Sequence, residues 1–239
     1  MQTTVNANVI PRVALRIPLR HVELRGEASL REGRRGLVVL ACGDGEHLYD
    51  RMNRDVARHL FDAGFATLVV ELLTPNESAE DAETSALRFH QSLLASRIVE
   101  VVRWARRTPI FTGLRIGFVA SGLCAGSVLA AAAVSTHIRA VVCCGPRLDL
   151  VLPRLERLRA DVLLIAGERD TAHLGAVVRM RHALPATSQV TMLPGAGHVL
   201  DDAATLLRVA GEAEEWFSQS LEQVAFDSER EEGALVGIA

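Results

Sequence analysis

A cysteine between two glycines stands where an apolar stretch changes into an alanine-rich one. The segment Gly122-Leu123-Cys124-Ala125-Gly126 follows the run 115–120 and precedes "SVLAAAAV". It fits the pattern G-x-nucleophile-x-G, a sharp strand-to-helix turn that holds its central side chain clear of the sheet in a strained conformation. The N-terminus of the next helix would stabilise a thiolate there. Cys124 is therefore the predicted nucleophile; Ser121 is a rival that lacks flanking glycines.

A thiol nucleophile needs a base, and the base needs an acid that orients it. Asp170 follows the apolar run "DVLLIAG", and His198 lies in the glycine-rich loop after the next run, "QVTMLP". The order is nucleophile, acid, histidine, with each residue at the end of a different predicted strand. We expect Cys124, Asp170 and His198 to be catalytic. His173 stays open as a rival base, and Asp170 could instead cap the next helix.

Acyl transfer also needs backbone donors for a developing oxyanion. One predicted donor is the N–H of Ala125, the residue after the nucleophile. The other lies in the loop "CGDG", at Gly43 and Asp44, where two glycines let the backbone approach a substrate oxygen. The plain alternative is a simple glycine turn.

Apolar runs of strand length alternate with helical patterns along the chain, which predicts an α/β fold with a mostly parallel sheet covered by helices on both faces. Reactive residues in such sheets lie in loops at the carboxyl ends of the strands. We predict one domain over residues 1–224 and a flexible tail over 225–239. The expected strands are a pair within 12–29, then 36–42, 66–73, 114–120, 139–144, 161–167 and 189–194. The expected helices are 49–62, 85–107, one from Ala125, 173–184 and 201–222, and 74–84 is expected to be a solvated loop.

The composition excludes several classes of protein. The chain has 239 residues and a formal net charge of only -3, so nothing points to a nucleic-acid partner. It contains no lysine, which excludes Schiff-base chemistry. We see no apolar run of the roughly 18 residues that a membrane span needs and no signal-peptide pattern. The four cysteines form no CxxC pair, so we expect no zinc site and a reducing cytoplasm.

Taken together, these motifs resemble the dienelactone hydrolase-like branch of the α/β-hydrolase superfamily. The resemblance rests on "GLVVLACGDG", "LRIGFVASGLCAGSVLAAA", "LLIAGERDT" and "LPGAGHVLDD", and it runs from about Val13 to Val224. It implies a three-layer α/β-hydrolase fold. It also implies a carboxylic ester hydrolase that cleaves a small ester, lactone or thioester through a cysteine acyl-enzyme, with neither metal nor organic cofactor. Residues 145–160 are too few for a large lid domain.

Three departures from the family pattern leave alternatives open. The segment before the elbow is about two residues longer than usual. Asp44 or Glu71 could replace a glutamate that pairs with the resting cysteine of dienelactone hydrolase. Arg147 could bind a substrate carboxylate, or could be an ordinary surface arginine. The alternative function is a non-catalytic or redox-sensing binding protein, with a reversible Cys42–Cys124 disulfide. A homodimer also stays open.

Overall fold

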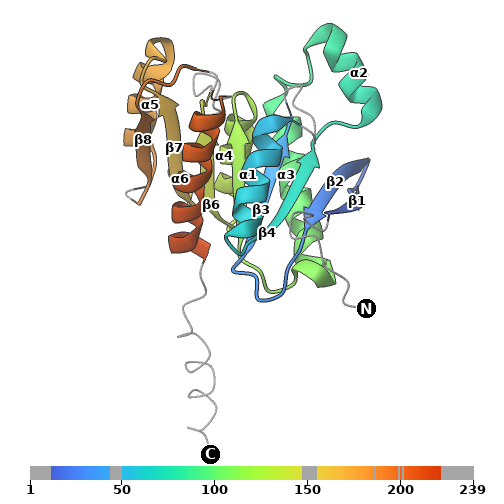
Figure 1. Ribbon diagram of the computed structural model, residues 1–239. Helices are drawn as coiled ribbons and strands as arrows, with labels where there is room; N and C mark the ends of the chain where they lie inside the picture. The colour runs from blue at the N-terminus through green and yellow to red at the C-terminus, as the bar shows by residue number, and fades with distance from the viewer. Residues whose placement is uncertain are drawn as a thin grey trace, which may run out of the picture.

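The computed structural model describes residues 12–43, 50–146, 155–185, 187–198, 200 and 202–221, and its core is one twisted sheet (Figure 1). Within these ranges the sheet has eight strands in the order β1-β2-β4-β3-β5-β6-β7-β8. From β3 to β8 all neighbours are parallel, whereas β2 is antiparallel to both β1 and β4. The strands are β1 (Arg12–Pro18), β2 (Glu23–Ser29), β3 (Leu37–Cys42), β4 (Ala66–Glu71), β5 (Ile116–Ser121), β6 (Ile138–Cys144), β7 (Asp161–Gly167) and β8 (Gln189–Leu193).

Helices cover both faces of this sheet, as the sequence predicts. Helices α1 and α6 pack on one face, and α3 and α4 pack on the other. The described helices are α1 (Arg51–Asp62), α2 (Pro75–Thr84), α3 (Gln91–Arg107), α4 (Cys124–Val134), α5 (Thr171–Ala183) and α6 (Ala203–Leu221). This is the predicted three-layer arrangement, and no lid domain is evident in the part of the chain that the structure describes.

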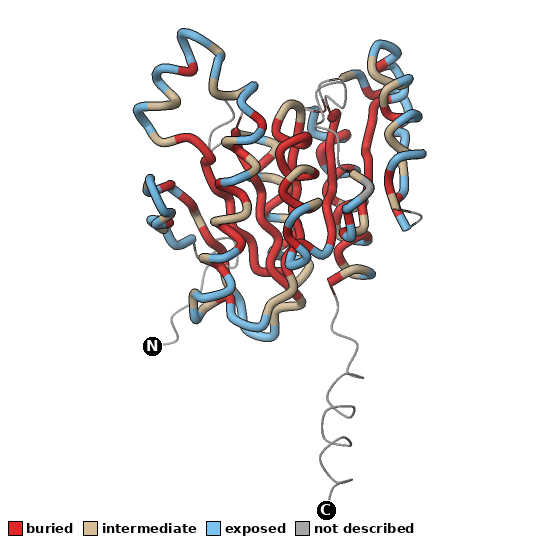
Figure 2. The backbone as a smooth tube through the Cα atoms, turned by 180° about the vertical axis from the view of Figure 1, so that it is seen from behind, coloured by how far each residue is buried: buried red, intermediate tan, exposed pale blue. Residues whose placement is uncertain are grey.

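The strands divide their side chains between two apolar cores. Along β3, Val38 and Leu40 enter the core under α1 and α6, whereas Val39 and Ala41 enter the core under α3 and α4. All six residues of β3 are buried, which is typical of a parallel strand with helices on both faces. Figure 2 shows the buried residues concentrated in the sheet and in the inner sides of these helices.

The segment 74–84 is a helix, α2, and the expectation of a loop is wrong. Thr74 and Glu77 form a capping box, in which the Thr74 side chain accepts from the Glu77 N–H and the Glu77 carboxylate accepts from the Thr74 N–H. Pro75 in the first turn has a backbone already suited to a helix start. Local capping thus stabilises a mostly exposed helix (Figure 2). Because this helix has no apolar face, hydrophobic periodicity in the sequence does not predict it.

Ser85 ends α2 instead of starting the next helix. It adopts the left-handed conformation, with φ 54°, and its N–H donates to the Asp81 carbonyl. Helix α3 begins only at Gln91, and the ring of His90 accepts from the Leu93 N–H at its start. The predicted long helix from 85 is therefore shorter at its N-terminal end, because a turn over 85–90 separates two capped helices.

The carboxyl ends of the parallel strands define one edge of the sheet. β3 lies between β4 and β5, so the chain order reverses beside it, and in open parallel sheets the crevice at such a reversal is the usual binding place. The loops after β3, β5, β7 and β8 all begin at this edge. None of the described helices combines the length and the hydropathy that a bilayer-spanning helix needs. The predicted tail over 225–239 lies outside the described residues.

Candidate active site

Cys124 is the first residue of α4, directly after the turn that follows β5. The expected strain is not at the cysteine: among described residues other than glycine, Ser85 alone has a positive φ, and in this turn the left-handed residue is Gly122, with φ 48°. Cys124 itself is completely buried. The positive φ of this turn thus lies two residues before Cys124, which stands in the first turn of α4.

The sulfur of Cys124 lies against the loop after β3. A Cβ added at Gly43 would stand 3.4 Å from Cys124 Sγ and would also meet the Cδ1 atoms of Leu72 and Leu94 at 3.4 and 3.3 Å. The structure therefore brings the predicted nucleophile and one predicted oxyanion residue together. Ala125 is buried beside them in the first turn of α4, where a backbone N–H has no partner within its own helix.

Asp170 and His198 meet as the sequence predicts. His198 Nδ1 lies 2.7 Å from Asp170 Oδ2, although 28 positions separate the two residues in the chain. Asp170 is buried, whereas the His198 side chain is 38% exposed. An acid fixed in the interior can thus hold an imidazole whose other face remains accessible to solvent. This geometry is what the acid and the base of a catalytic triad require.

A second histidine shares the same carboxylate. His173, in the first turn of α5, places its Nδ1 2.7 Å from Asp170 Oδ1, the oxygen that His198 does not use. The two rings stack with their centroids 4.3 Å apart and an interplanar angle of 24°. Burial by itself would raise the pKa of Asp170, but the hydrogen bonds from His173 and His198 outweigh it and hold that pKa below its ordinary value. Asp170 is therefore a carboxylate at neutral pH.

Backbone contacts hold the loops of Asp170 and His198 together. The Arg169 N–H donates to the Ala196 carbonyl at 2.9 Å, and the Gly195 N–H donates to Glu168 Oε2 at 3.0 Å. Gly167 lies so close to the carbonyls of Ala196 and Gly197 that a Cβ there would overlap them. The position of His198 is thus set by backbone packing as well as by its bond to Asp170.

The structure describes some of the other predicted site residues and not others. Asp44 and Arg147 lie outside the described residues. Ser121 is buried and is the last residue of β5, directly before the turn that leads to Cys124. The Glu71 carboxylate is bound by Arg25, at 2.6 Å from Nη2 and 2.8 Å from Nε.

The thiols of the chain are all reduced and all buried. Cys42 accepts a hydrogen bond from the Asn53 side chain, with Nδ2 and Sγ 3.1 Å apart. Burial raises the pKa of Cys143 to about 12. Since only a thiolate is a good nucleophile, Cys143 is unsuited to chemistry near neutral pH.

The sequence did not indicate that Gln91 lies beside the elbow, and it offered His173 only as a rival base. Gln91 is buried in the first turn of α3, where its side chain packs on Gly126, and its Oε1 has no hydrogen-bond partner in the described structure. No local pattern marks Gln91, because its position follows from the tertiary packing of α3. His173 had a readable signal: an Asp at a helix start and a His three residues later lie on one face of that helix.

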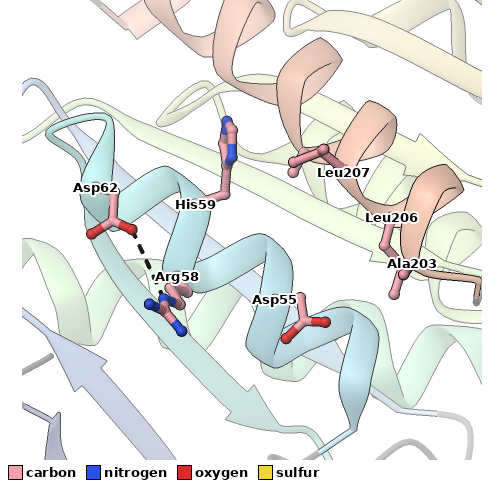
Figure 3. A pocket seen from close by; sticks show the side chains of 8 residues that line it. Asp55, Arg58, His59, Asp62, Ala203, Leu206 and Leu207 are labelled. Carbon is pink, nitrogen blue, oxygen red and sulfur yellow. Dashed lines mark ion pairs between the residues drawn. The ribbon is translucent and has the colours of Figure 1, made fainter. Parts of the chain in front are cut away.

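A separate groove of about 340 Å³ lies between α1 and α6 (Figure 3). An ion pair between Arg58 and Asp62 lies on its wall. Beside it, His59 and Glu214 are hydrogen-bonded, with Nε2 and Oε2 2.6 Å apart. Its lining includes Leu206 and Leu207 but none of the predicted catalytic residues. The groove is therefore distinct from the candidate active site.

Known proteins resemble the chain over most of its length. The sequence model of the dienelactone hydrolase family matches residues 34–219. A crystal structure of dienelactone hydrolase from Anabaena variabilis has a TM-score of 0.86 and 33% identity, covering 89% of this chain and 99% of that one. A lidless α/β serine hydrolase from Xanthomonas campestris has a TM-score of 0.69 at 17% identity, covering 89% and 96%, so it supports the fold alone.

Curated relatives are longer than this chain. Two Mycobacterium tuberculosis proteins, from strains CDC 1551 and H37Rv, are described as candidate phosphoribosyl transferases. Each is 38% identical over 201 residues, which make up 84% of this chain and 44% of the relative. The chain thus spans less than half the length of these relatives.

Proposed function

The chain belongs to the dienelactone hydrolase family, and on that premise we propose that it hydrolyses a small ester, lactone or thioester through a Cys124 acyl-enzyme. The observation that carries the proposal is the Asp170–His198 pair, bonded at 2.7 Å at the strand edge that also carries Cys124. A buried acid that orients an accessible imidazole is what a thiol nucleophile at this edge requires.

The reaction follows from the roles of these groups. His198 takes the Cys124 proton at Nε2, while Asp170 holds the Nδ1–H side of the ring and stabilises the imidazolium. The thiolate sulfur bonds to the substrate carbonyl carbon, and the N–H groups of Ala125 and Gly43 stabilise the oxyanion. The leaving group departs with the His198 proton. His198 then deprotonates a water molecule, which attacks the acyl carbon and releases the acid and the Cys124 thiol.

The burial of Cys124 sets a condition on this mechanism. The Cys124 side chain is completely buried and the backbone of Gly43 lies against its sulfur, so a carbonyl reaches the sulfur only when the side chain rotates or its neighbours move apart. A small substrate suits such a site better than a long acyl chain.

The substrate class is limited to what this site can hold. Arg147, which the resemblance suggests as a carboxylate-binding residue, is proposed in that role for an acidic ester or lactone. The phosphoribosyl transferase description belongs to proteins of more than twice the matched length. It is therefore not carried over to this chain.

The test compares hydrolysis of p-nitrophenyl acetate, a small lactone and a small thioester by wild type, Cys124→Ala and His198→Gln. We expect kcat/KM to fall at least about a thousandfold in both variants, because residues of a triad act as a unit. The acyl group should be found on Cys124 by mass spectrometry after rapid acid quenching. Cys143→Ala is the matched control, since that thiol is also buried but has a pKa of about 12. Equal rates in wild type and Cys124→Ala would refute the proposal.

One observation favours a second candidate, a non-catalytic binding member of the family: the predicted nucleophile, Cys124, is completely buried. In that case wild type and Cys124→Ala would share a background rate on every substrate, while small molecules would still alter the unfolding temperature. The redox version would also require Cys42 and Cys124 to form a disulfide, which non-reducing peptide mapping after mild oxidation would detect.

A further inference from the structure

Asp170, His173 and His198 form a cluster with more donors than a hydrolytic triad needs. One oxygen of Asp170 orients His198, and the triad requires nothing of the other oxygen. That oxygen nevertheless binds the ring of His173, again at 2.7 Å. One potential ligand atom from each residue lies within 4.8 Å of the other two. Two imidazoles and one carboxylate therefore converge on a common point at the edge of the sheet.

This donor set is typical of transition-metal sites that keep an open coordination position. Zinc takes imidazole nitrogen at about 2.0–2.1 Å and carboxylate oxygen at about 2.0–2.2 Å, with three protein ligands in its open sites. Imidazole also suits copper and nickel, whereas magnesium and calcium prefer oxygen. The acid is buried and fixed at the start of α5, while the His173 and His198 side chains are 23% and 38% exposed. An ion can therefore reach the rings from solvent and find the carboxylate behind them.

We propose that Asp170, His173 and His198 form a binding site for a divalent transition-metal ion, with Zn²⁺ as the best match, and that the bound ion inhibits the hydrolase. The ion would lie between the carboxylate and the Nδ1 atoms, in place of the two N–H hydrogen bonds. Each ring would keep its proton but carry it on Nε2 instead of Nδ1, so the change needs no net release of protons from neutral rings. With an ion between them, each Nδ1 and the carboxylate must lie farther apart than in a direct hydrogen bond. A small movement of the rings away from the carboxylate provides this distance.

Inhibition follows from this change of tautomer. In the proposed mechanism His198 accepts the Cys124 proton at Nε2, which must therefore be unprotonated. A ring with a metal ion on Nδ1 and a proton on Nε2 has no free lone pair for that proton. The inhibition rests on the proposed function, whereas the binding site itself does not.

The experiment measures binding directly, with the full chain freed of any affinity tag. Zn²⁺ binding at pH 7.5 is followed by competition with a chromophoric chelator, and Co²⁺ binding by its visible absorption bands. Wild type is expected to bind one equivalent of each ion. His173→Gln should weaken binding by at least about tenfold, since losing even an outer-shell partner of a metal ligand costs that much. The control His182→Gln changes an exposed histidine in the last turn of the same helix and should match wild type.

The outcomes separate this proposal from the hydrolase assignment. Absence of one-equivalent binding by wild type, or equal affinities of wild type and His173→Gln, would overturn the site even if hydrolysis is found. His173→Asn, with circular dichroism of both variants, guards against a folding defect in one of them. If the protein hydrolyses the ester panel, Zn²⁺ should inhibit wild type at least about tenfold more strongly than His173→Gln, and a chelator should restore the rate. Zn²⁺ binding without inhibition would retain the site and reject its regulatory role.

Discussion

At the scale of single residues, the site depends on contacts that no spacing in the sequence reveals. The order Cys124, Asp170, His198 was sufficient to predict that acid and base meet, because parallel strands bring their carboxyl ends to one edge. It was not sufficient to predict that Cys124 is completely buried, because burial depends on tertiary packing, in which the backbone of Gly43 comes to lie against the sulfur. The pattern of a glycine-flanked nucleophile also predicted a strained backbone at Cys124, whereas the positive φ of this turn is at Gly122, which as a glycine adopts it without strain.

Gly167 provides a test of how the backbone positions His198. A Cβ at this residue would lie 2.5 Å from the Ala196 carbonyl oxygen and closer still to that of Gly197, and backbone atoms cannot move aside as a side chain can. We expect Gly167→Ala to lower the free energy of unfolding by about 1–3 kcal/mol. It should also lower kcat/KM by up to about a hundredfold, since a 1 Å displacement of a catalytic group has that effect.

The control for Gly167→Ala is Gly211→Ala in α6, where an added Cβ would meet nothing within 4 Å. That change should raise the free energy of unfolding by about 1 kcal/mol, because alanine favours a helix over glycine. Urea unfolding and steady-state kinetics of both variants give the answer. If Gly167→Ala behaves like Gly211→Ala, the loop of His198 is not held by this close approach.

At the scale of elements, apolar periodicity predicted every described strand and most helices. It failed where capping residues, not an apolar face, determine where a helix forms and begins. The parallel strands are continuous apolar runs because both of their faces are buried. Helix α2 has no such run: it is built by the Thr74–Glu77 capping box and by ion pairs from its polar residues. A composition rich in Glu, Asp, Ser and Thr is typical of loops, and only the T-x-x-E spacing pointed to a helix start.

Helix α2 is fastened to α3 by an ion pair whose strength should depend on pH. Arg97 donates to both oxygens of Glu77, at 2.6 and 2.8 Å, and it also donates to the Leu72 carbonyl. The hydrogen bonds from Arg97 are the main reason that the pKa of Glu77 is lowered to about 2. A carboxylate with a lowered pKa stabilises the fold fully above its ordinary pKa of about 4.3, and this stabilisation is lost as the pH falls toward 2.

We therefore expect Glu77→Gln to lower the free energy of unfolding by about 1 kcal/mol at pH 7 and by less than half as much at pH 3. Urea unfolding at the two pH values measures both differences. Glu80→Gln, an exposed change on the same helix, should stay within about 0.5 kcal/mol of wild type at either pH. A Glu77→Gln effect that is the same at both pH values would show that the pair with Arg97 is not the source of the stabilisation.

At the scale of the whole molecule, one sheet separates two cores that must form together. Each β strand between β3 and β7 sends alternate side chains to opposite faces, as the neighbours Cys143 and Cys144 do. Neither core can lose its strands without exposing the other. On the side of α6, Phe217 packs on Gly117 of β5 and meets the ring of Phe65 edge-on at 6.3 Å. The two cores therefore share the sheet as their common wall.

The two tryptophans of the chain lie in different cores and can report on each separately. Trp104 in α3 packs edge-on against Phe111 on one face, and Trp216 in α6 is buried on the other. In Trp104→Phe and Trp216→Phe the remaining indole follows a single core. If the sheet couples the cores, fluorescence in both variants and far-ultraviolet circular dichroism should give coincident urea transitions.

Adding Phe217→Ala to each variant should move both transitions to lower urea concentration, by about 3–5 kcal/mol in free energy, although the substitution removes side-chain atoms from only one core. Leu207→Ala, an exposed change on the same helix, should move neither by more than about 0.5 kcal/mol. Two separate midpoints, or a Phe217→Ala effect confined to the Trp216 signal, would mean that the faces of the sheet unfold independently.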